Sequence, residues 1–422
     1  MGCDPVVHLA KVESVNGPWA STKLNGLESL ASRFHSHLSN DVEVENHQRN
    51  LNFVSTDIPE NALQDIQVFR LFRHYKDHLA SWYDLNDSHR HFTDRVPVKA
   101  RSSPLLLSAI LAFSAISLHN SSSESLADVA EFYHLESVRY LLQITRNIED
   151  VVSNGEVLAA ICLLRSFEII SQDLSSQSHL QGCYSILASN SINLDSLSSL
   201  ARAAFWNYLR EDITVALIER RKLMIELPDE HIPRNPVTDD EYANVVTIIL
   251  GQIINRCFGD GTSSLQQLLL DQVNLETWKH SLPHSFTPIL NHTLAEKGEK
   301  AFPFMGTLHG WHAAAIQYYQ TAMIILRLSK PNQQAISVID NLEQITELNR
   351  ELESRSTEIC ALALSSESQA VWINSFGPIA FCGCWLRDQN KFRDIISGVK
   401  DWGSRTGWPV SDIIKSLQES SS

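Results

Sequence analysis

Residues 74–118 read HYKDHLASWYDLNDSHRHFTDRVPVKARSSPLLLSAILAFSAISL, and this stretch decides the fold. It opens inside a run over residues 66–82 whose apolar side chains recur every three to four positions, the pattern of an amphipathic helix. Residues 105–118 are apolar nearly all round, which is typical of a buried helix, and Ser102–Pro104 in front suits a helix start. The stretch therefore predicts two helices joined by a polar junction.

Further segments of helical period follow along the chain. Residues 201–223 carry apolar side chains on one face, residues 309–329 form a long helical segment, and residues 411–417 form a short one at the end. Alternating β-branched runs with tight turns are missing from the sequence. We therefore expect an all-α fold, with a large single helical domain over residues 61–422 behind a loosely ordered polar arm over residues 1–60.

Charge and cysteine content narrow the class of protein. A formal net charge of −15 argues against direct nucleic acid binding, which depends on clustered Lys and Arg. Seven cysteines scattered over a long chain do not form a disulfide framework, and the one close pair, Cys382 and Cys384, is weak evidence for a metal. The start shows no signal peptide, and residues 105–118 are too short for a membrane span. We expect an intracellular, cytoplasmic protein that binds no membrane.

The polar junction, SWYDLNDSHRHFTD at residues 81–94, raises the question of a metal site. Its carboxylates and imidazoles are typical metal ligands: Asp84, Asp87, His89, His91 and Asp94. Residues two positions apart, such as His89 and His91, do not share a helix face, so their spacing is poor for zinc on a helix. Asp and His are common in ordinary turns. The sequence predicts a capped turn here and no metal site.

Four segments in order give the chain a family resemblance. Residues 74–118 resemble the opening of the fungal-specific transcription factor regulatory domain, the helical middle homology region of zinc-cluster regulators. Three more segments are similar to its central helix, its long helix with Trp-His and Tyr-Tyr pairs, and its closing Thr-Gly-Trp-Pro segment: LARAAFWNYLREDITVALIERRKL (200–223), FPFMGTLHGWHAAAIQYYQTAMIILRLSKP (302–331) and FGPIAFCGCWLRDQNKFRDIISGVKDWGSRTGWPV (376–410). The resemblance implies an all-helical scaffold that senses a ligand or a partner.

One family element is missing from the sequence. The family's regulators read DNA through an N-terminal cluster of six cysteines around two zinc ions, whereas residues 1–65 contain the single cysteine Cys3. The resemblance then implies a stand-alone member without the zinc-cluster domain, unless an upstream exon encoding it was lost in gene modelling.

Two functions compete for such a scaffold. The first is a cofactor-independent enzyme of fungal secondary metabolism, a cyclase or pericyclase of the hetero-Diels–Alder type that acts on a polyketide or terpenoid intermediate. The sequence lacks a phosphate loop, a GxSxG elbow, an HExxH motif and a CxxC pair, and a cycloaddition needs orientation and hydrogen bonds rather than these groups. The alternative is a transcriptional regulator or co-regulator, nuclear in that case, that acts through a ligand or a DNA-binding partner. Whether the chain forms a homodimer is left undecided by the sequence.

Candidate site residues come from the long and central helical segments. His312, Tyr318 and Arg210 are expected to donate hydrogen bonds, as catalytic residues, at one end of an aromatic cavity. Four aromatic or flexible side chains on the same segments are expected to bind the substrate: Trp206, Trp311, Tyr319 and Met323. Each of these residues could instead be an ordinary member of the core. Arg165, in an apolar run, is expected to pair with a carboxylate such as Glu168.

Overall fold

The computed structural model of the protein describes residues 53–144, 155–171, 197–227, 235–259, 264–292, 301–330 and 337–419. Most of the predicted arm, residues 1–52, lies outside the described residues. Its end is packed on the helices: Thr56 is buried and its hydroxyl lies 2.5 Å from that of Ser108, and Asp57 forms an ion pair with Arg139. The single domain over residues 61–422 stays a prediction.

The described residues are almost entirely helical, so the all-α prediction is confirmed. The elements of the first half are α3 (Pro59–Ala62), α4 (Ile66–His74), η1 (Tyr75–Leu79), α5 (Ala80–Tyr83), η2 (His91–Arg95), α6 (Val96–Ala100), α7 (Pro104–Ser121), α8 (Ala127–Ile144), α10 (Gly155–Ser171) and α12 (Ser199–Glu219). Those of the second half are α13 (Asp239–Cys257), α14 (Leu265–Ser281), η6 (His284–Phe286), β1 (Leu290–His292), β2 (Phe304–Gly306), α15 (Gly310–Ser329), α16 (Val338–Leu364), α17 (Gln369–Cys382), η8 (Gly383–Trp385), α18 (Gln389–Thr406) and α19 (Ser411–Glu419).

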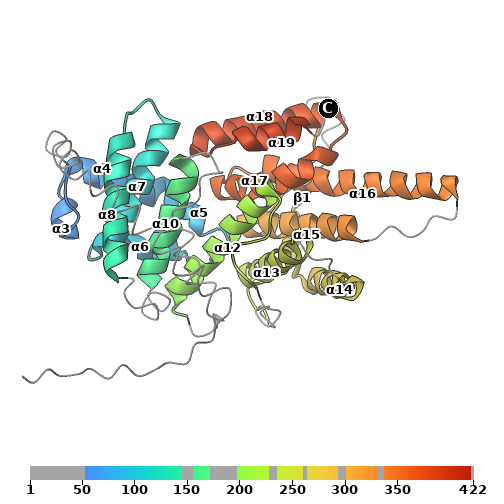
Figure 1. The fold of residues 1–422 in the computed structure, drawn as a ribbon, viewed down its shortest axis with the longest axis horizontal. Helices are drawn as coiled ribbons and strands as arrows, with labels where there is room; N and C mark the ends of the chain where they lie inside the picture. The colour runs from blue at the N-terminus through green and yellow to red at the C-terminus, as the bar shows by residue number, and fades with distance from the viewer. Residues whose placement is uncertain are drawn as a thin grey trace, which may run out of the picture.

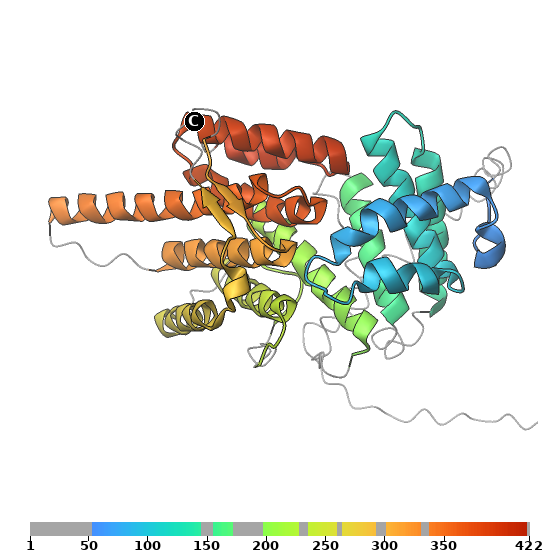
Figure 2. The same ribbon diagram turned by 180° about the vertical axis from the view of Figure 1, so that it is seen from behind.

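Two groups of helices flank α12 (Figure 1). Helices α4 to α10 form one group, and α13 to α17 form the other (Figure 2). Helix α12 packs against α10 of the first group and against α13 and α17 of the second. Its side chains are buried on nearly every face, so it connects the two halves of the core.

Helix α7 is the centre of the first group. Ser103 caps it through a hydrogen bond from the Leu106 amide, and Pro104 occupies the first turn, as predicted. The helix is longer than the apolar run suggested: its 18 residues pass the length and composition test for a membrane span, alone among the described helices. Because 72% of that apolar window is buried by α4, α8, α10 and other helices, α7 has the character of a core helix.

Several boundaries differ from the prediction. Helix α12 ends four residues early, because Arg220 adopts a left-handed conformation with φ of 54°. Gly407, with φ of 73°, ends α18. The short antiparallel pair of β1 and β2 was not predicted, since three-residue strands leave no alternating pattern.

The crossing of α12 and α17 is unusually close. A Cβ atom on Gly377 would lie 2.7 Å from the Thr214 Cα atom and 2.9 Å from the Thr214 carbonyl oxygen, so only glycine fits there. The next residue, Pro378, lacks the N–H that would bond to the Asn374 carbonyl one turn earlier. Both features lie beside the cavity described below.

Candidate functional site

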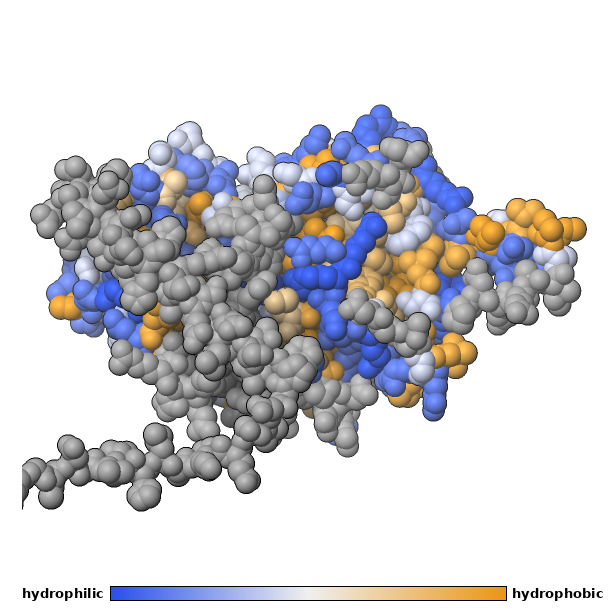
Figure 3. Space-filling view, viewed as in Figure 1, coloured by the Kyte–Doolittle hydropathy of each residue, from blue (hydrophilic) through white to orange (hydrophobic). Residues whose placement is uncertain are grey.

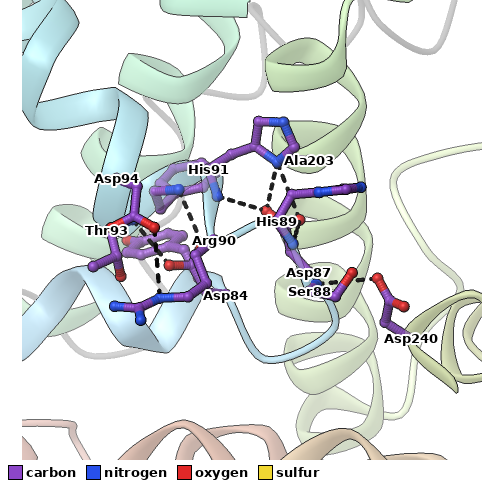
Figure 4. A network of polar contacts seen from close by, with 12 residues as sticks. Asp84, Asp87, Ser88, His89, Arg90, His91, Thr93, Asp94, Ala203 and Asp240 are labelled. Atoms are coloured by element: carbon purple, nitrogen blue, oxygen red, sulfur yellow. Dashed lines mark hydrogen bonds and ion pairs between the residues drawn. The ribbon is translucent and has the colours of Figure 1, made fainter. Parts of the chain in front are cut away.

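The polar junction of residues 84–94 is a capped turn, as predicted (Figure 4). Asp84 accepts hydrogen bonds of 2.9 Å from the backbone amides of Phe92 and Thr93. Asp87 accepts from the amide of His91 at 2.9 Å and contacts the His91 ring nitrogen at 2.8 Å. These carboxylates are therefore engaged in holding the turn. No group of three or more metal-ligating side chains was found among the described residues.

A small cavity lies behind this turn, where α5, α10, α12 and α17 meet. Its volume is about 40 Å³, and it is partly open to the surface. The lining is Trp82, Tyr83, Leu85, Ser166, Asn207, Arg210, Glu211, Thr214, Ala370, Ile373, Asn374 and Trp408. The space is enough for roughly two or three water-sized groups. A whole polyketide or terpenoid needs a pocket of roughly 300–1,000 Å³, so this cavity admits only one end of such a molecule.

Arg210, predicted as a donor, lines this cavity and is 6% exposed. Its guanidinium donates to the Asn207 side-chain oxygen and, at 3.4 Å, to the Tyr83 carbonyl. Burial lowers the pKa of Arg210, while the phenol of Tyr318 and the carboxyl of Glu211 oppose that effect. These contacts fix the position of a cationic group that has five N–H donors in all.

Two further residues of the lining carry a buried donor that has no partner in the described part of the chain. Asn374 on α17 is 5% exposed, and its side-chain oxygen accepts a 2.7 Å hydrogen bond from the Tyr318 hydroxyl. Because this bond assigns the oxygen of the amide, the other terminal atom of the side chain is the nitrogen, Nδ2. Within the described residues, neither Asn374 Nδ2 nor Trp408 Nε1 meets a hydrogen-bond acceptor. A buried donor without an acceptor costs about 1–3 kcal/mol. An oxygen-bearing group in the cavity would remove that cost.

The cavity lining also contains a carboxyl group, that of Glu211. Ser166 donates to one oxygen of Glu211 and accepts a 2.5 Å hydrogen bond from the Tyr83 hydroxyl. The other Glu211 oxygen lies 3.7 Å from Nε of Arg165. Burial raises the pKa of Glu211 to about 7, although Arg165 opposes the shift. Hydrogen-bond donors and a carboxyl that titrates near neutral pH therefore line the same partly open cavity.

Tyr318 lies behind Asn374 rather than in the cavity lining. It is fully buried on α15, and its hydroxyl is used in the bond to Asn374. Burial raises its pKa, an effect that Arg210 and the hydrogen bond to Asn374 oppose. Tyr318 thus bonds to Asn374, a residue that the sequence did not single out and that lines the same cavity as Arg210.

His312 lies outside this cavity, at the start of α15. Its Nε2 atom lies 2.9 Å from an Asp239 oxygen and 3.1 Å from Nε1 of Trp311, and its ring packs 4.5 Å from the ring of Phe286. Burial lowers the pKa of His312, while Asp239 opposes the shift. The side chain also accepts from the His309 amide, which caps the helix. His312 therefore joins α15 to α13.

The other predicted binding residues are also absent from the cavity lining. Trp206 is buried and packs edge-on against Phe205. Trp311 and Met323 are half-buried against the core, and Tyr319 stacks on Trp278 with ring centroids 5.7 Å apart. These positions agree with packing roles for all four side chains.

Asn374, Trp408 and Glu211 are the site residues that sequence reasoning missed. Asn374 is an amide inside the apolar run AVWINSFGPIAF, and an amide buried in such a run needs partners. Trp408 belongs to the Thr-Gly-Trp-Pro landmark, which was noted for its order in the chain alone. Glu211 follows Arg210 directly, but which face of α12 meets the cavity depends on packing.

A buried ion-pair cluster supports the same helix. Arg165 on α10 lies 3.6 Å from an Asp212 oxygen, in addition to its contact with Glu211, so its carboxylate partners are on α12. The expected ion pair with Glu168 does not form; Glu168 is 8% exposed and its Oε1 atom lacks a hydrogen-bond partner in the described part of the chain. Burial raises the pKa of Glu168 to about 8, against the effect of Arg165.

Glu168 should make stability fall as the pH rises. Its pKa is higher in the folded protein than the ordinary value of 4.5, so the folded state binds the extra proton and is favoured at low pH. That contribution is complete below about pH 4.5 and is lost as the pH rises through about 8. Urea unfolding at a series of pH values from 5 to 9 should show a smaller fall in Glu168→Gln than in the unchanged protein. Equal slopes in the two proteins would contradict the assignment.

The fold and the cavity define an all-α domain with a small polar site at the crossing of its central helices. The chain belongs to the fungal specific transcription factor domain family, whose model matches residues 70–295. That range includes Arg210 and Glu211, whereas Asn374 and Trp408 lie beyond it. It also contains two of the four sequence landmarks, those at 74–118 and 200–223.

One curated relative is a regulator by name. Transcription activator AMTR1 from Alternaria alternata is 21% identical over 349 residues, with 66% of this chain and 45% of the activator covered. The chain therefore spans less than half the length of that relative. No solved structure is significantly similar to the chain.

Proposed function

We propose that this chain is the regulatory domain of a fungal transcriptional regulator, and that a small molecule with an oxygen acceptor at one end controls it by binding beside Arg210. Family membership and the relative named as an activator support the first part. The second part depends on one observation above all: Asn374 and Trp408, whose buried Nδ2 and Nε1 atoms meet no acceptor among the described residues, line the same cavity as Arg210.

The donor set selects the chemistry of the ligand. The Arg210 guanidinium, Asn374 Nδ2 and Trp408 Nε1 are all hydrogen-bond donors, so they favour a ligand with a carboxylate or a carbonyl oxygen. Because the guanidinium is positively charged, it favours the carboxylate over the neutral carbonyl. The cavity of about 40 Å³ holds that head group. The remainder of the molecule extends through the open side, past the apolar side chains of Leu85 and Ile373.

A head group bound beside Arg210 would contact residues from several helices, so its binding can change how these helices are arranged. Arg210 is on α12, Asn374 is on α17, and Trp408 lies between α18 and α19. A head group that satisfies all three donors therefore stabilises one arrangement of these helices over others. A ligand shifts a conformational equilibrium only by its difference in affinity for the two states, and donors on separate helices provide such a difference.

A reporter assay tests the regulatory role. The full chain is fused to an unrelated DNA-binding module and expressed in a fungal host whose metabolites supply the ligand. We expect reporter transcription that falls several-fold in Arg210→Met, because the variant keeps the length of the side chain and loses its donors. Arg202→Met, an exposed change on the same helix, is the matched control and should leave transcription unchanged. A fusion that never alters transcription, or equal output from both variants, would contradict the proposal.

A second candidate function is the cofactor-independent cyclase. The same donors favour it, because Arg210, Asn374 and Trp408 could polarise the carbonyl of a quinone methide while a polyene approaches from the open side. Such a cycloaddition converts two π bonds into two σ bonds and releases no atom, so no further reactant is required. The reacting carbons would sit at the mouth of the cavity, since the interior accommodates only the oxygen end.

Product analysis separates the two functions. The purified chain is incubated with a quinone methide precursor and a terpenoid polyene, and the stereochemistry of the adduct is measured. An excess of one enantiomer formed above the uncatalysed rate supports the cyclase. A racemic adduct at the uncatalysed rate, together with the reporter response described above, supports the regulator.

A further inference from the structure

The first three turns of α16 project from the body of the protein. Figure 1 shows this end of α16 reaching beyond α15 and α17. Residues 338–347 are exposed apart from Asp340, which is half-buried, whereas the helix is packed from Leu352 onward. An isolated helix of fewer than roughly 12–15 residues is marginal in water, so a projecting segment of this length gains little from its own backbone.

The projecting segment is apolar on one side. Val338 is 78% exposed, Leu342 60% and Ile345 48%, and Ile339 beside them is 68% exposed. Figure 3 shows hydrophobic side chains gathered on this tip. Such a run of large apolar side chains without cover from the described residues is rare on a monomer and marks an interaction surface.

The exposed stripe continues a stripe that is already packed. Val338, Leu342 and Ile345 are spaced four and three residues apart, and the same alternation leads on through position 349 to Leu352 and Ile359. The last two are buried where α16 packs on α15 and α17. Alternation of three and four residues is the heptad pattern by which one helix packs along another. The seam used inside the protein thus extends beyond the end of its internal partners.

We propose that a second copy of this chain covers the exposed seam, so that the projecting ends of two α16 helices form a short coiled coil. The seam is self-complementary, because apolar residues at heptad spacing meet the same residues on the partner helix. The positions that flank it are uncharged: Ile339, Asn341, Thr346 and Leu348.

Charge placement favours a second copy over a basic partner. The acidic residues of the segment, Asp340, Glu343 and Glu347, are on the side of the helix away from the seam, by the helical period. Two copies can therefore approach without opposing like charges at the seam, although each chain has a net charge of −15. A partner with basic flanks would instead require acidic residues at the flanking positions.

Helix α14 supplies more apolar surface at the same end of the molecule. Leu265, Leu269 and Val273 are about half exposed on one face of this helix, and Figure 1 shows α14 at the same end of the molecule as the projecting end of α16, with α15 between the two helices. A stable interface buries roughly 800 Å² on each partner, so we infer that surface beyond the α16 tip takes part. The α14 face provides the additional contact.

Sedimentation equilibrium of the full chain tests the proposal. We expect twice the monomer mass of 47.5 kDa at micromolar concentration. The double change L342E/I345E should return the monomer mass, since it places charges in the seam. The control Q344E/S354E adds the same two charges on exposed positions away from the seam and should stay dimeric. The milder pair L342A/I345A, which keeps helix propensity, should raise the dimer Kd at least tenfold.

Three results would overturn the proposal. The unchanged chain could be monomeric at every concentration, which would mean that another segment or another protein covers the seam. The seam variants could dimerise as tightly as the control pair, which would place the interface elsewhere. The control pair Q344E/S354E could dissociate as readily as L342E/I345E, which would mean that the added negative charge, and not the loss of the seam, separates the two chains. Far-UV circular dichroism of each variant confirms that the helices are retained.

Discussion

Replacing Asp212 with alanine should lower the free energy of unfolding by about 3–5 kcal/mol, the range for removing one member of a buried ion pair. Asp212 is fully buried on α12. Its oxygens lie 3.6 Å from Nη2 of Arg165 and 3.3 Å from Nη1 of Arg221, and one accepts a 2.6 Å hydrogen bond from the Met224 amide. The alanine variant leaves the buried Arg165 with one carboxylate fewer, so the cost exceeds that of a lost surface contact.

Urea denaturation gives this free energy, and Glu219→Ala is the control. Glu219 is also an ion-pair partner of Arg221, but it is about one-third exposed. Ion pairs of that kind contribute about 0–1 kcal/mol, so the control should cost far less than Asp212→Ala. A loss below about 1 kcal/mol in Asp212→Ala would contradict the role of this cluster in fixing α12 against α10.

Arg210→Met should abolish measurable binding of acetate, the simplest probe with a carboxylate head group. A hydrogen bond to a charged partner contributes about 1.5–3 kcal/mol, which corresponds to a loss of affinity of roughly ten- to more than a hundredfold. Trp408→Phe, which removes one neutral donor, should weaken binding by a smaller factor. Arg202→Met on the exposed side of α12 should bind acetate as the unchanged chain does. Isothermal titration on the full chain measures all four proteins.

The fold was predictable because its signals are local. The apolar run of α7 and the periodic stripes of α4, α12 and α15 each occur within about twenty residues, so the helical period is visible without knowledge of contacts. The boundaries were less accurate where one residue decided them. Arg220 ends α12 in a left-handed conformation that the sequence RRK does not specify.

The site was predictable only in part, because it is assembled from distant segments. Arg210 was predicted as a donor on the central helical segment, and Tyr318 as a donor on the long one. Asn374, which bonds to Tyr318 and lines the cavity with Arg210, is more than fifty residues from either. Its position depends on how closely α17 approaches α12 at Gly377, and no local pattern gives that distance. His312 shares the helix of Tyr318 but contacts Asp239 instead, because it lies nearly two turns away.

The size of the cavity was not predictable either. A cavity that holds a complete substrate stays a prediction, whereas many aromatic rings of the described residues pack on one another, as Trp372 does on Trp402 with centroids 5.9 Å apart. The aromatic content of a sequence shows what a core contains and gives no measure of the space left inside it. The space that remains beside Arg210 is small.

The indole N–H signal of Trp408 in a two-dimensional nitrogen–proton NMR spectrum tests the ligand site most directly. Trp408→Phe assigns the signal by its disappearance. On addition of acetate, the signal should move and reach saturation in the unchanged chain and in Arg202→Met, and should stay fixed in Arg210→Met. A Trp408 signal that does not respond, or that responds equally with and without the Arg210 guanidinium, would contradict a head-group site in this cavity.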